Sequence, residues 1–194
     1  MIEANIIQIT RRVLLLSGCI ALLGLAAWAQ GSRFDSSSLS QKGRQAYYGL
    51  LKVELFAIGG IGYGGTTSSG EKFLDVLIEE KTATEAFKQL ITDGTTEGGF
   101  YGLFGLKMLN CDCFEKELAR YKYLRLSTEN KSPFRTQSGC LVFKAVTQED
   151  KQMILQVYMK DEFLKMAHQK ECRRQFKGRP NEQAKCWNEE LKQK

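Results

Sequence analysis

The chain has 194 residues, of which 43 % are hydrophobic and 26 % charged, and its formal net charge is +6. This length and apolar content are enough for one domain with a core but short for two. The charge is ordinary in amount and basic in balance, so composition alone selects no function.

The N-terminus has the pattern of an export signal. A pair of arginines precedes an uncharged apolar run over residues 13–29, which ends in an A-x-A cleavage site formed by Ala27 and Ala29. The run is slightly shorter than the roughly 20 residues of a comfortable membrane span. We therefore predict that residues 1–29 are a signal peptide, with an uncleaved N-terminal membrane anchor as the alternative.

Two further export signals overlap this segment. Residues 16–19, LSGC, match a bacterial lipobox, although the apolar run before the cysteine is short and the run after it continues, unlike a lipoprotein. Residues 10–15, TRRVLL, resemble a twin-arginine signal. Each alternative places the body of the protein outside the cytoplasm, where it is periplasmic, secreted or membrane-anchored.

The cysteines indicate disulfides. Of six cysteines, removal of the export signal takes away Cys19 and leaves Cys111, Cys113, Cys140, Cys172 and Cys186. In an oxidising compartment such cysteines are expected to pair. Zinc is the rival interpretation, but the C-x-C at 111–113 lacks the usual C-x₂-C spacing and the single histidine is distant. We expect neither a metal nor a cofactor.

Hydrophobic periodicity divides the remaining chain into a polar linker (30–45), a helical domain (46–159) and a basic helical hairpin (160–194). Capping residues and helical spacing predict helices over 46–58, 69–78, 82–93, 97–109, 113–126 and 147–159. Outside the glycine-rich region, residues 140–146, CLVFKAV, have the clearest pattern of a strand. The fold class is therefore mainly α, an irregular, solenoid-like array of helical hairpins.

Capping residues support several of these helices. Ser68 with Glu71 and Thr82 with Glu85 each form an S/T-x-x-E capping box. Thr147 is expected to cap the helix that follows the strand.

The segment 97–109 is apolar on nearly every face yet contains Gly98, Gly102 and Gly105. Each glycine costs helix propensity, so close packing of a neighbouring helix is the expected compensation. The sequence YYGLL at 47–51 aligns with FYGLF at 100–104, which suggests duplicated helical-hairpin modules.

Most of the net positive charge lies in residues 160–194. The basic residues beside the predicted turn form a candidate patch for an anionic partner, although a solvated helix face explains them equally. This basic patch consists of Arg173, Arg174, Lys177 and Arg179. Lipid head groups, cell-wall polymers or an acidic protein are the anionic partners expected outside the cell.

The same hairpin predicts a disulfide. Cys172 and Cys186 lie at matching distances on either side of the turn at 178–181, so the hairpin places them opposite each other. Cys140 would then pair with Cys111 or Cys113, leaving one thiol free, buried or intermolecular.

The glycine-rich stretch carries two near-matches to nucleotide-binding motifs. GIGYGG at 60–65 has the G-x-G-x-x-G pattern after a run, 53–58, that could also be a strand. The distance to Glu80 leaves no room for the helix, loop and second strand of a dinucleotide site. GTTSSGE at 65–71 resembles a P-loop, but Glu71 stands where lysine is needed. We expect a glycine turn between two helices.

Catalytic motifs give little support to an enzyme. His168 is the single histidine and falls in a charged helical segment, which predicts a solvated surface position. The common serine-hydrolase and metalloprotease motifs are absent from the sequence. A hydrolase that uses scattered carboxylates remains an alternative.

One family resemblance is apparent. The elements FAIGGIG (56–62), GTTSSGE (65–71) and FYGLFGL (100–106) resemble a family of uncharacterised exported bacterial proteins with a GTTS-x-GE element and a YxLxGL helix. The resemblance covers about residues 47–146. It implies a bacterial envelope setting, and because the family has no established activity, the resemblance assigns no functional site.

These patterns together predict an exported, non-enzymatic helical protein of the cell envelope that binds a protein or an anionic surface. Nucleic acid is not favoured, because few aromatic residues interleave with the basic ones. Membrane contact is expected through residues 13–29. The alternative is an extracytoplasmic hydrolase or a phosphate-binding protein that uses the loop Gly59–Gly70.

Overall fold

The structure is a computed structural model that describes residues 34–127, 130–158 and 163–190. The chain divides into two units, Met1–Phe34 and Asp35–Lys194, and the fold below is that of the second. The predicted export signal, with Ala27 and Ala29, lies outside the described residues. Within the described part, none of the helices is both long and apolar enough to cross a membrane.

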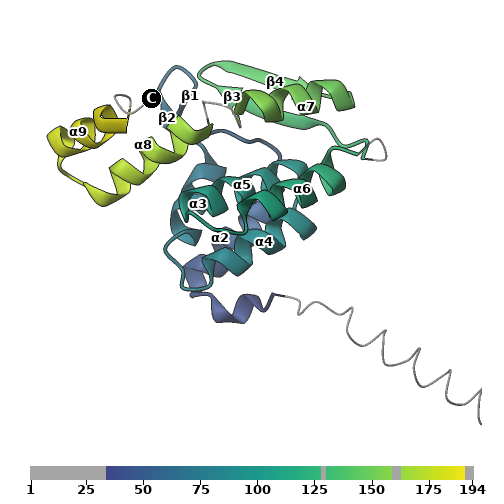
Figure 1. Cartoon of the computed structure of the whole chain (residues 1–194), viewed down its shortest axis with the longest axis horizontal. Helices are drawn as coiled ribbons and strands as arrows, with labels where there is room; N and C mark the ends of the chain where they lie inside the picture. Colours follow the sequence, from purple (N-terminus) through teal and green to yellow (C-terminus); the bar gives the residue numbers. More distant parts are fainter. Residues whose placement is uncertain (1–33, 128–129, 159–162, 191–194) are drawn as a thin grey trace, which may run out of the picture. The chain divides into compact units, whose positions relative to one another are not determined.

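The fold is mainly α-helical, as the sequence predicts (Figure 1). The described helices are η1 (Ser36–Ser38), α2 (Gln41–Leu51), α3 (Ser69–Leu77), α4 (Ala83–Asp93), α5 (Thr96–Met108), α6 (Phe114–Arg125), α7 (Gln148–Val157), α8 (Phe163–Gln175) and α9 (Pro180–Glu190). The described strands are β1 (Gly60–Ile61), β2 (Thr66–Thr67), β3 (Phe134–Ser138) and β4 (Leu141–Ala145). The predicted linker is shorter than expected, because η1 and α2 occupy much of it.

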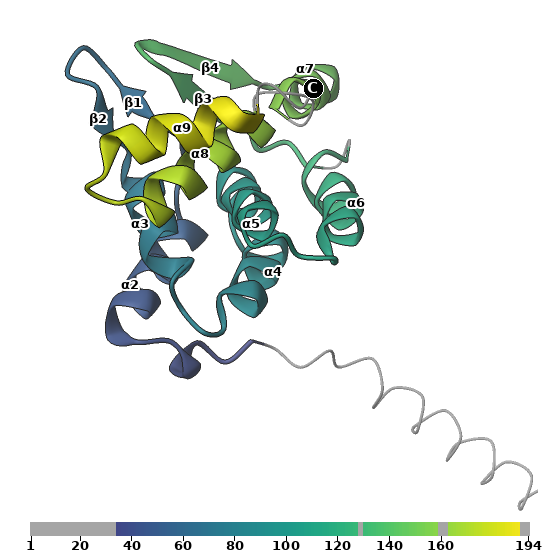
Figure 2. The same ribbon diagram turned by 60° about the vertical axis from the view of Figure 1, so that its left-hand side comes forward.

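Helix α5 is the centre of the fold. All of its residues except Lys107 are buried. Helices α2, α3, α4, α6 and α8 all contact it, and Figure 2 shows it among its neighbours. A helix that is apolar on every face must be surrounded, which is why 97–109 takes this position. The helices are therefore gathered around α5, which contacts partners far from it in sequence.

The glycines of α5 allow this close packing, as predicted. A Cβ atom on Gly98 would collide with the carbonyl oxygen of Leu50 in α2. A Cβ atom on Gly102 would lie 2.7 Å from the carbonyl oxygen of Phe87 in α4, and one on Gly105 would collide with the Phe87 ring. Neighbouring backbones thus approach α5 more closely than any larger residue would allow.

The predicted helix 46–58 is wrong at its C-terminal end. Helix α2 stops at Leu51, and Phe56 instead pairs with β3 through an isolated parallel bridge to Thr136. The Phe56 N–H donates to the carbonyl of Arg135 (2.9 Å), and the buried ring packs against Phe100. A continuous apolar run satisfies either a helix or a buried extended segment, so local periodicity could not decide between them.

Two antiparallel hairpins replace the single predicted strand. β1 pairs with β2, and β3 pairs with β4 from Phe134↔Ala145 to Ser138↔Leu141. The strand predicted at 140–146 corresponds to β4. The sequence predicts no strand for its partner β3, and it predicts a glycine turn where β1 and β2 lie.

The helix caps differ from one another. Ser68 accepts a hydrogen bond from the N–H of Glu71 (3.0 Å), and Thr147 accepts one from Asp150 (3.1 Å), as predicted. Thr82 stands at the N-cap of α4 but its side chain makes no capping bond. The second predicted capping box is therefore wrong.

Candidate functional site

The tips of the two β-hairpins are fastened together. The N–H of Gly62 donates to the carbonyl of Gly139 (2.9 Å), and Ile61 forms a parallel bridge with the same residue. Gly62, Gly65 and Gly139 all have positive φ, at 66°, 58° and 55°, so the two turns depend on glycine. Figures 1 and 2 both show the β1–β2 turn beside the β3–β4 turn.

Large apolar side chains project from these tips into solvent. Tyr63, in the β1–β2 turn, is fully exposed, and Leu141, Val142 and Phe143 of β4 are between 49 % and 65 % exposed. We call these four residues the hairpin platform. Large apolar side chains gathered in exposed positions are typical of an interaction site.

The register of β4 explains why both of its faces are apolar. Leu141 and Phe143 share the face that carries the core residue Ala145, whereas Val142 lies on the opposite face. Within the described residues β4 pairs with β3 alone, and Leu141 to Lys144 are exposed. The outer edge of β4 is therefore open to an additional strand.

The chain below the β1–β2 hairpin is held rigidly. The Tyr101 hydroxyl donates to the carbonyl of Ala57 (2.8 Å) and accepts from its N–H (2.9 Å). The Ser68 hydroxyl donates to the same carbonyl (2.8 Å). Burial raises the pKa of Tyr101 to about 12, so this hydroxyl stays protonated and keeps its donor role. The platform thus rests on a fixed base.

Glu71 has a different role from the predicted capping box. Its side chain is 6 % exposed and accepts from the N–H of Gly59 (2.8 Å), while Lys170 of α8 pairs with it (2.7 Å). Ser68 makes its part of the capping box, because its hydroxyl accepts from the Glu71 N–H. The Glu71 carboxylate does not complete the box, because it is directed at the glycine loop. A carboxylate already occupies the loop amide that a phosphate would need, which is electrostatically unfavourable for phosphate binding.

The glycine stretch also lacks the geometry of a nucleotide loop. β1 is followed by a turn and by β2, whereas a dinucleotide or P-loop site needs a strand, a loop and then a helix. The expectation that neither motif is functional therefore agrees with the local backbone.

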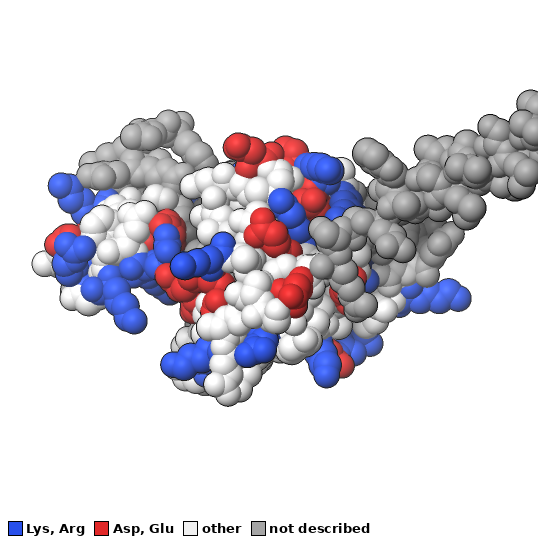
Figure 3. Space-filling model, turned by 90° about the horizontal axis from the view of Figure 1, so that it is seen from below, with Lys and Arg blue, Asp and Glu red and all other residues white. Residues whose placement is uncertain are grey.

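Much of the predicted basic patch is engaged within the protein. Acidic side chains on α3 and just beyond its C-terminal end face basic ones on α8, so that Asp75 also pairs with Lys170 (2.6 Å) and Glu79 with Arg174 (3.3 Å). Arg179 pairs with Glu182 (2.8 Å). Figure 3 shows basic and acidic side chains side by side at the end of the molecule that carries α8 and α9.

A cleft of about 750 Å³ lies between α3 and α8. Ile78 and Met108 provide its apolar surface, and Arg173 and Lys177 of the basic patch line it together with the paired side chains. Neither of these two basic residues forms an ion pair with another described residue.

A second cleft, of about 540 Å³, lies at the N-terminus of α5 and is lined by Glu54, Glu97 and Arg135 among others. Glu97 is buried and accepts a hydrogen bond from the N–H of Arg135 (2.7 Å). Burial raises the pKa of its carboxyl, and the Arg135 hydrogen bond offsets part of that effect. Sequence reasoning took this residue only as the start of an apolar helix.

The structure contains two disulfides among the described residues. Cys172 and Cys186 are joined, with an S–S distance of 2.06 Å, which is the pair that the hairpin symmetry predicts. The other prediction, Cys140 with Cys111 or Cys113, is wrong: Cys111 is joined to Cys113, and Cys140 keeps an exposed free thiol beside the platform. Disulfides are typical of proteins from an oxidising, extracytoplasmic compartment.

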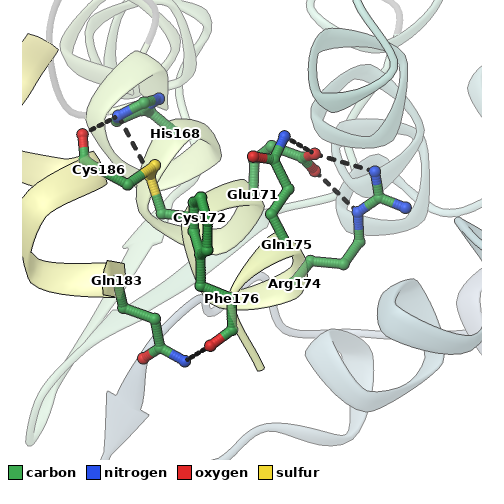
Figure 4. The surroundings of a disulfide bond; sticks show 8 residues. All are labelled: His168, Glu171, Cys172, Arg174, Gln175, Phe176, Gln183 and Cys186. Atoms are coloured by element: carbon green, nitrogen blue, oxygen red, sulfur yellow. Dashed lines mark hydrogen bonds and ion pairs between the residues drawn. A yellow bond between two sulfur atoms is a disulfide. The ribbon is translucent and has the colours of Figure 1, made fainter. Parts of the chain in front are cut away.

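His168 is also placed differently from the expectation. It is half-buried between α8 and α9 rather than on a solvated face, and its imidazole lies against the Cys172–Cys186 disulfide (Figure 4). The spacing of four residues between His168 and Cys172, one helical turn, was the available signal.

Comparison with protein-family models, with curated proteins and with solved structures finds no match. The functional interpretation therefore rests on the geometry above.

Proposed function

We propose that the protein is an extracytoplasmic binding protein that holds a protein partner on the hairpin platform. The observation that carries this proposal is the exposure of Tyr63, Leu141, Val142 and Phe143 on two hairpin tips that are tied together. Exposed aromatic and aliphatic side chains on a fixed base are typical of protein-binding surfaces, because little ordering entropy is lost on binding.

The open edge of β4 suggests how the partner binds. An extended apolar segment can add to β4 as a further strand, with main-chain hydrogen bonds giving affinity and alternate side chains giving specificity. Leu141 and Phe143 would contact one side of the added strand and Val142 the other. Strand addition also covers an edge that would otherwise favour aggregation.

Site-specific photo-crosslinking in the native cell tests this proposal. A photoreactive residue at Val142 is expected to give a discrete protein adduct, whereas the same residue at Tyr123 is not. Tyr123 is 77 % exposed on α6 and serves as the matched control. Equal adducts from both positions, or adducts to lipid alone from Val142, would contradict a protein partner at the platform.

An anionic surface is a second candidate partner. Its support is that Arg173 and Lys177 are exposed and have no ion pair with the described residues. The neighbouring acids Glu79 and Glu182 weaken this candidate, because they neutralise Arg174 and Arg179. If it holds, the protein should bind anionic liposomes more than neutral ones, and added salt should abolish the difference. Equal retention on anionic and neutral liposomes would contradict an anionic surface as the partner.

A further inference from the structure

The Cys172–Cys186 disulfide has an imidazole beside one of its sulfurs. Nε2 of His168 lies 3.3 Å from Sγ of Cys172 and 3.2 Å from the carbonyl oxygen of Cys186 (Figure 4). The imidazole nitrogen of His168 and the Sγ atoms of the two cysteines all lie within 4.8 Å of one another. The arrangement is held by the α8–α9 hairpin, which Gln183 also closes through a bond to the carbonyl of Phe176 (2.8 Å).

The two atoms next to Nε2 of His168 determine which ring nitrogen of the imidazole carries the hydrogen. A carbonyl oxygen and a disulfide sulfur can only accept hydrogen bonds. Nε2 must therefore carry the hydrogen, and it donates toward both atoms. A donor thus points at the sulfur of Cys172 while the disulfide is still intact.

The two sulfurs differ in access. Cys172 is 2 % exposed, whereas Cys186 is half-buried and so the more accessible of the two. An incoming thiolate can reach Cys186, and Cys172 is then the leaving group. The leaving sulfur is the one that faces the His168 donor.

We propose that the Cys172–Cys186 disulfide is an exchange site that oxidises dithiols of exported proteins, with His168 stabilising the leaving thiolate. A substrate thiolate attacks Sγ of Cys186, and a substrate–Cys186 disulfide forms. The Cys172–Cys186 bond breaks and its electron pair goes to Sγ of Cys172, which the Nε2–H of His168 stabilises. The second substrate thiolate attacks the substrate sulfur and releases Cys186. The substrate loses two electrons and two protons, and the two protein sulfurs gain them as thiols.

The surroundings favour a thiolate at this position. Cys172 lies between Glu171 and Arg173 on α8, and Arg174 is paired with Glu171 and Glu79, so among the described residues Arg173 is the basic neighbour whose charge is left over. Positive charge near a thiol lowers its pKa and makes it a better leaving group. Glu171 lies near His168, and its pKa is lowered chiefly by the Arg174 hydrogen bond, with a smaller contribution from His168. The Cys111–Cys113 disulfide cannot have an imidazole donor of its own while the single histidine lies at Cys172, so it is an internal comparator.

The test measures the rate at which dithiothreitol reduces each of the two disulfides. The protein carries Cys140→Ser, samples are quenched over time, and mass mapping shows which disulfide has been reduced. His168→Phe, which keeps a ring but removes the donor, should slow reduction of Cys172–Cys186 about tenfold. It should also lower the reduction potential of that disulfide, by about 30 mV for each tenfold change in equilibrium constant. His168→Gln, which restores a donor, should recover most of the lost rate. Reduction of Cys111–Cys113 should be unchanged in both variants.

The direction of the effect separates this proposal from a purely structural role. If His168 only steadied the hairpin, His168→Phe would loosen it and make the disulfide easier to reduce. Gln183→Ala loosens the hairpin without touching His168 and should leave reduction unchanged or faster. Reduction of His168→Phe at the parent rate or faster would overturn the proposal, as would equal rates for His168→Phe and His168→Gln.

Discussion

The Glu71 carboxylate links three segments that lie far apart in the sequence. It accepts a hydrogen bond from Gly59 of the glycine loop, belongs to the first turn of α3, and pairs with Lys170, which is 99 residues away. Both charged side chains are close to fully buried, at 6 % and 11 % exposed. Breaking such a pair leaves a buried charge poorly compensated.

We therefore expect Glu71→Gln to lower the free energy of unfolding by about 1–3 kcal/mol, because a buried charge-assisted bond to Lys170 is lost. The matched control is Glu79→Gln, two residues beyond the last residue of α3. Its partner Arg174 and Glu79 itself are both about half-exposed, so the change should stay within about 0.5 kcal/mol. Urea denaturation of both variants measures the difference, and equal losses would show that burial is not decisive.

Glu97 predicts a pH dependence. Burial raises its pKa, so in the window above the ordinary glutamate pKa the folded state binds more protons than the unfolded state. The contribution of Glu97 to the free energy of unfolding is therefore fully present at low pH, and it is lost as the pH rises through the raised pKa. Glu97→Gln removes that loss while keeping an acceptor for the Arg135 N–H. The stability of the variant relative to the parent should increase between about pH 4 and about pH 7. A constant or decreasing difference would contradict the raised pKa.

At the scale of elements, the two predicted capping boxes give different outcomes. Ser68 caps α3 and also bonds Ala57, whereas the Thr82 side chain makes no capping bond. Ser68→Ala should lower the free energy of unfolding by about 1–2 kcal/mol. Thr82→Ala should change it by less than about 0.5 kcal/mol. Thermal unfolding of the pair is sufficient, and a larger loss for Thr82→Ala would contradict the capping geometry.

Helices with local signals could be predicted from the sequence. Ser68, Thr147 and the glycine-spaced apolar face of α5 define their helices within a few residues, because caps and periodicity act over one or two turns. The end of α2 could not be predicted. Residues 53–58 are buried as an extended segment against β3, and only that distant pairing excludes a helix there.

At the scale of the whole molecule, the candidate site was only partly accessible from sequence. The Cys172–Cys186 disulfide follows from hairpin symmetry alone. The hairpin platform does not, because it depends on the bond between Gly62 and Gly139, whose turns are remote in the chain. The basic patch looked free in the sequence, yet acids neutralise part of it, because Arg174 pairs with Glu79 and Glu171 and Arg179 pairs with Glu182. The sequence gives the number of charged residues, whereas the fold determines which of them lie close enough to pair.

The most direct test of a binding site at the hairpin platform uses the partner that photo-crosslinking identifies. This partner is purified without the crosslink, and its affinity for the protein is measured. Val142→Asp and Phe143→Ser change exposed residues of β4, so both should fold normally, and each should weaken binding at least about tenfold because an apolar contact surface is lost. Tyr123→Ser, a change at a still more exposed residue on α6, should leave the dissociation constant unaltered. Titration calorimetry that found parent-like affinity for both β4 variants, or equal weakening by Tyr123→Ser, would contradict a binding site at the hairpin platform.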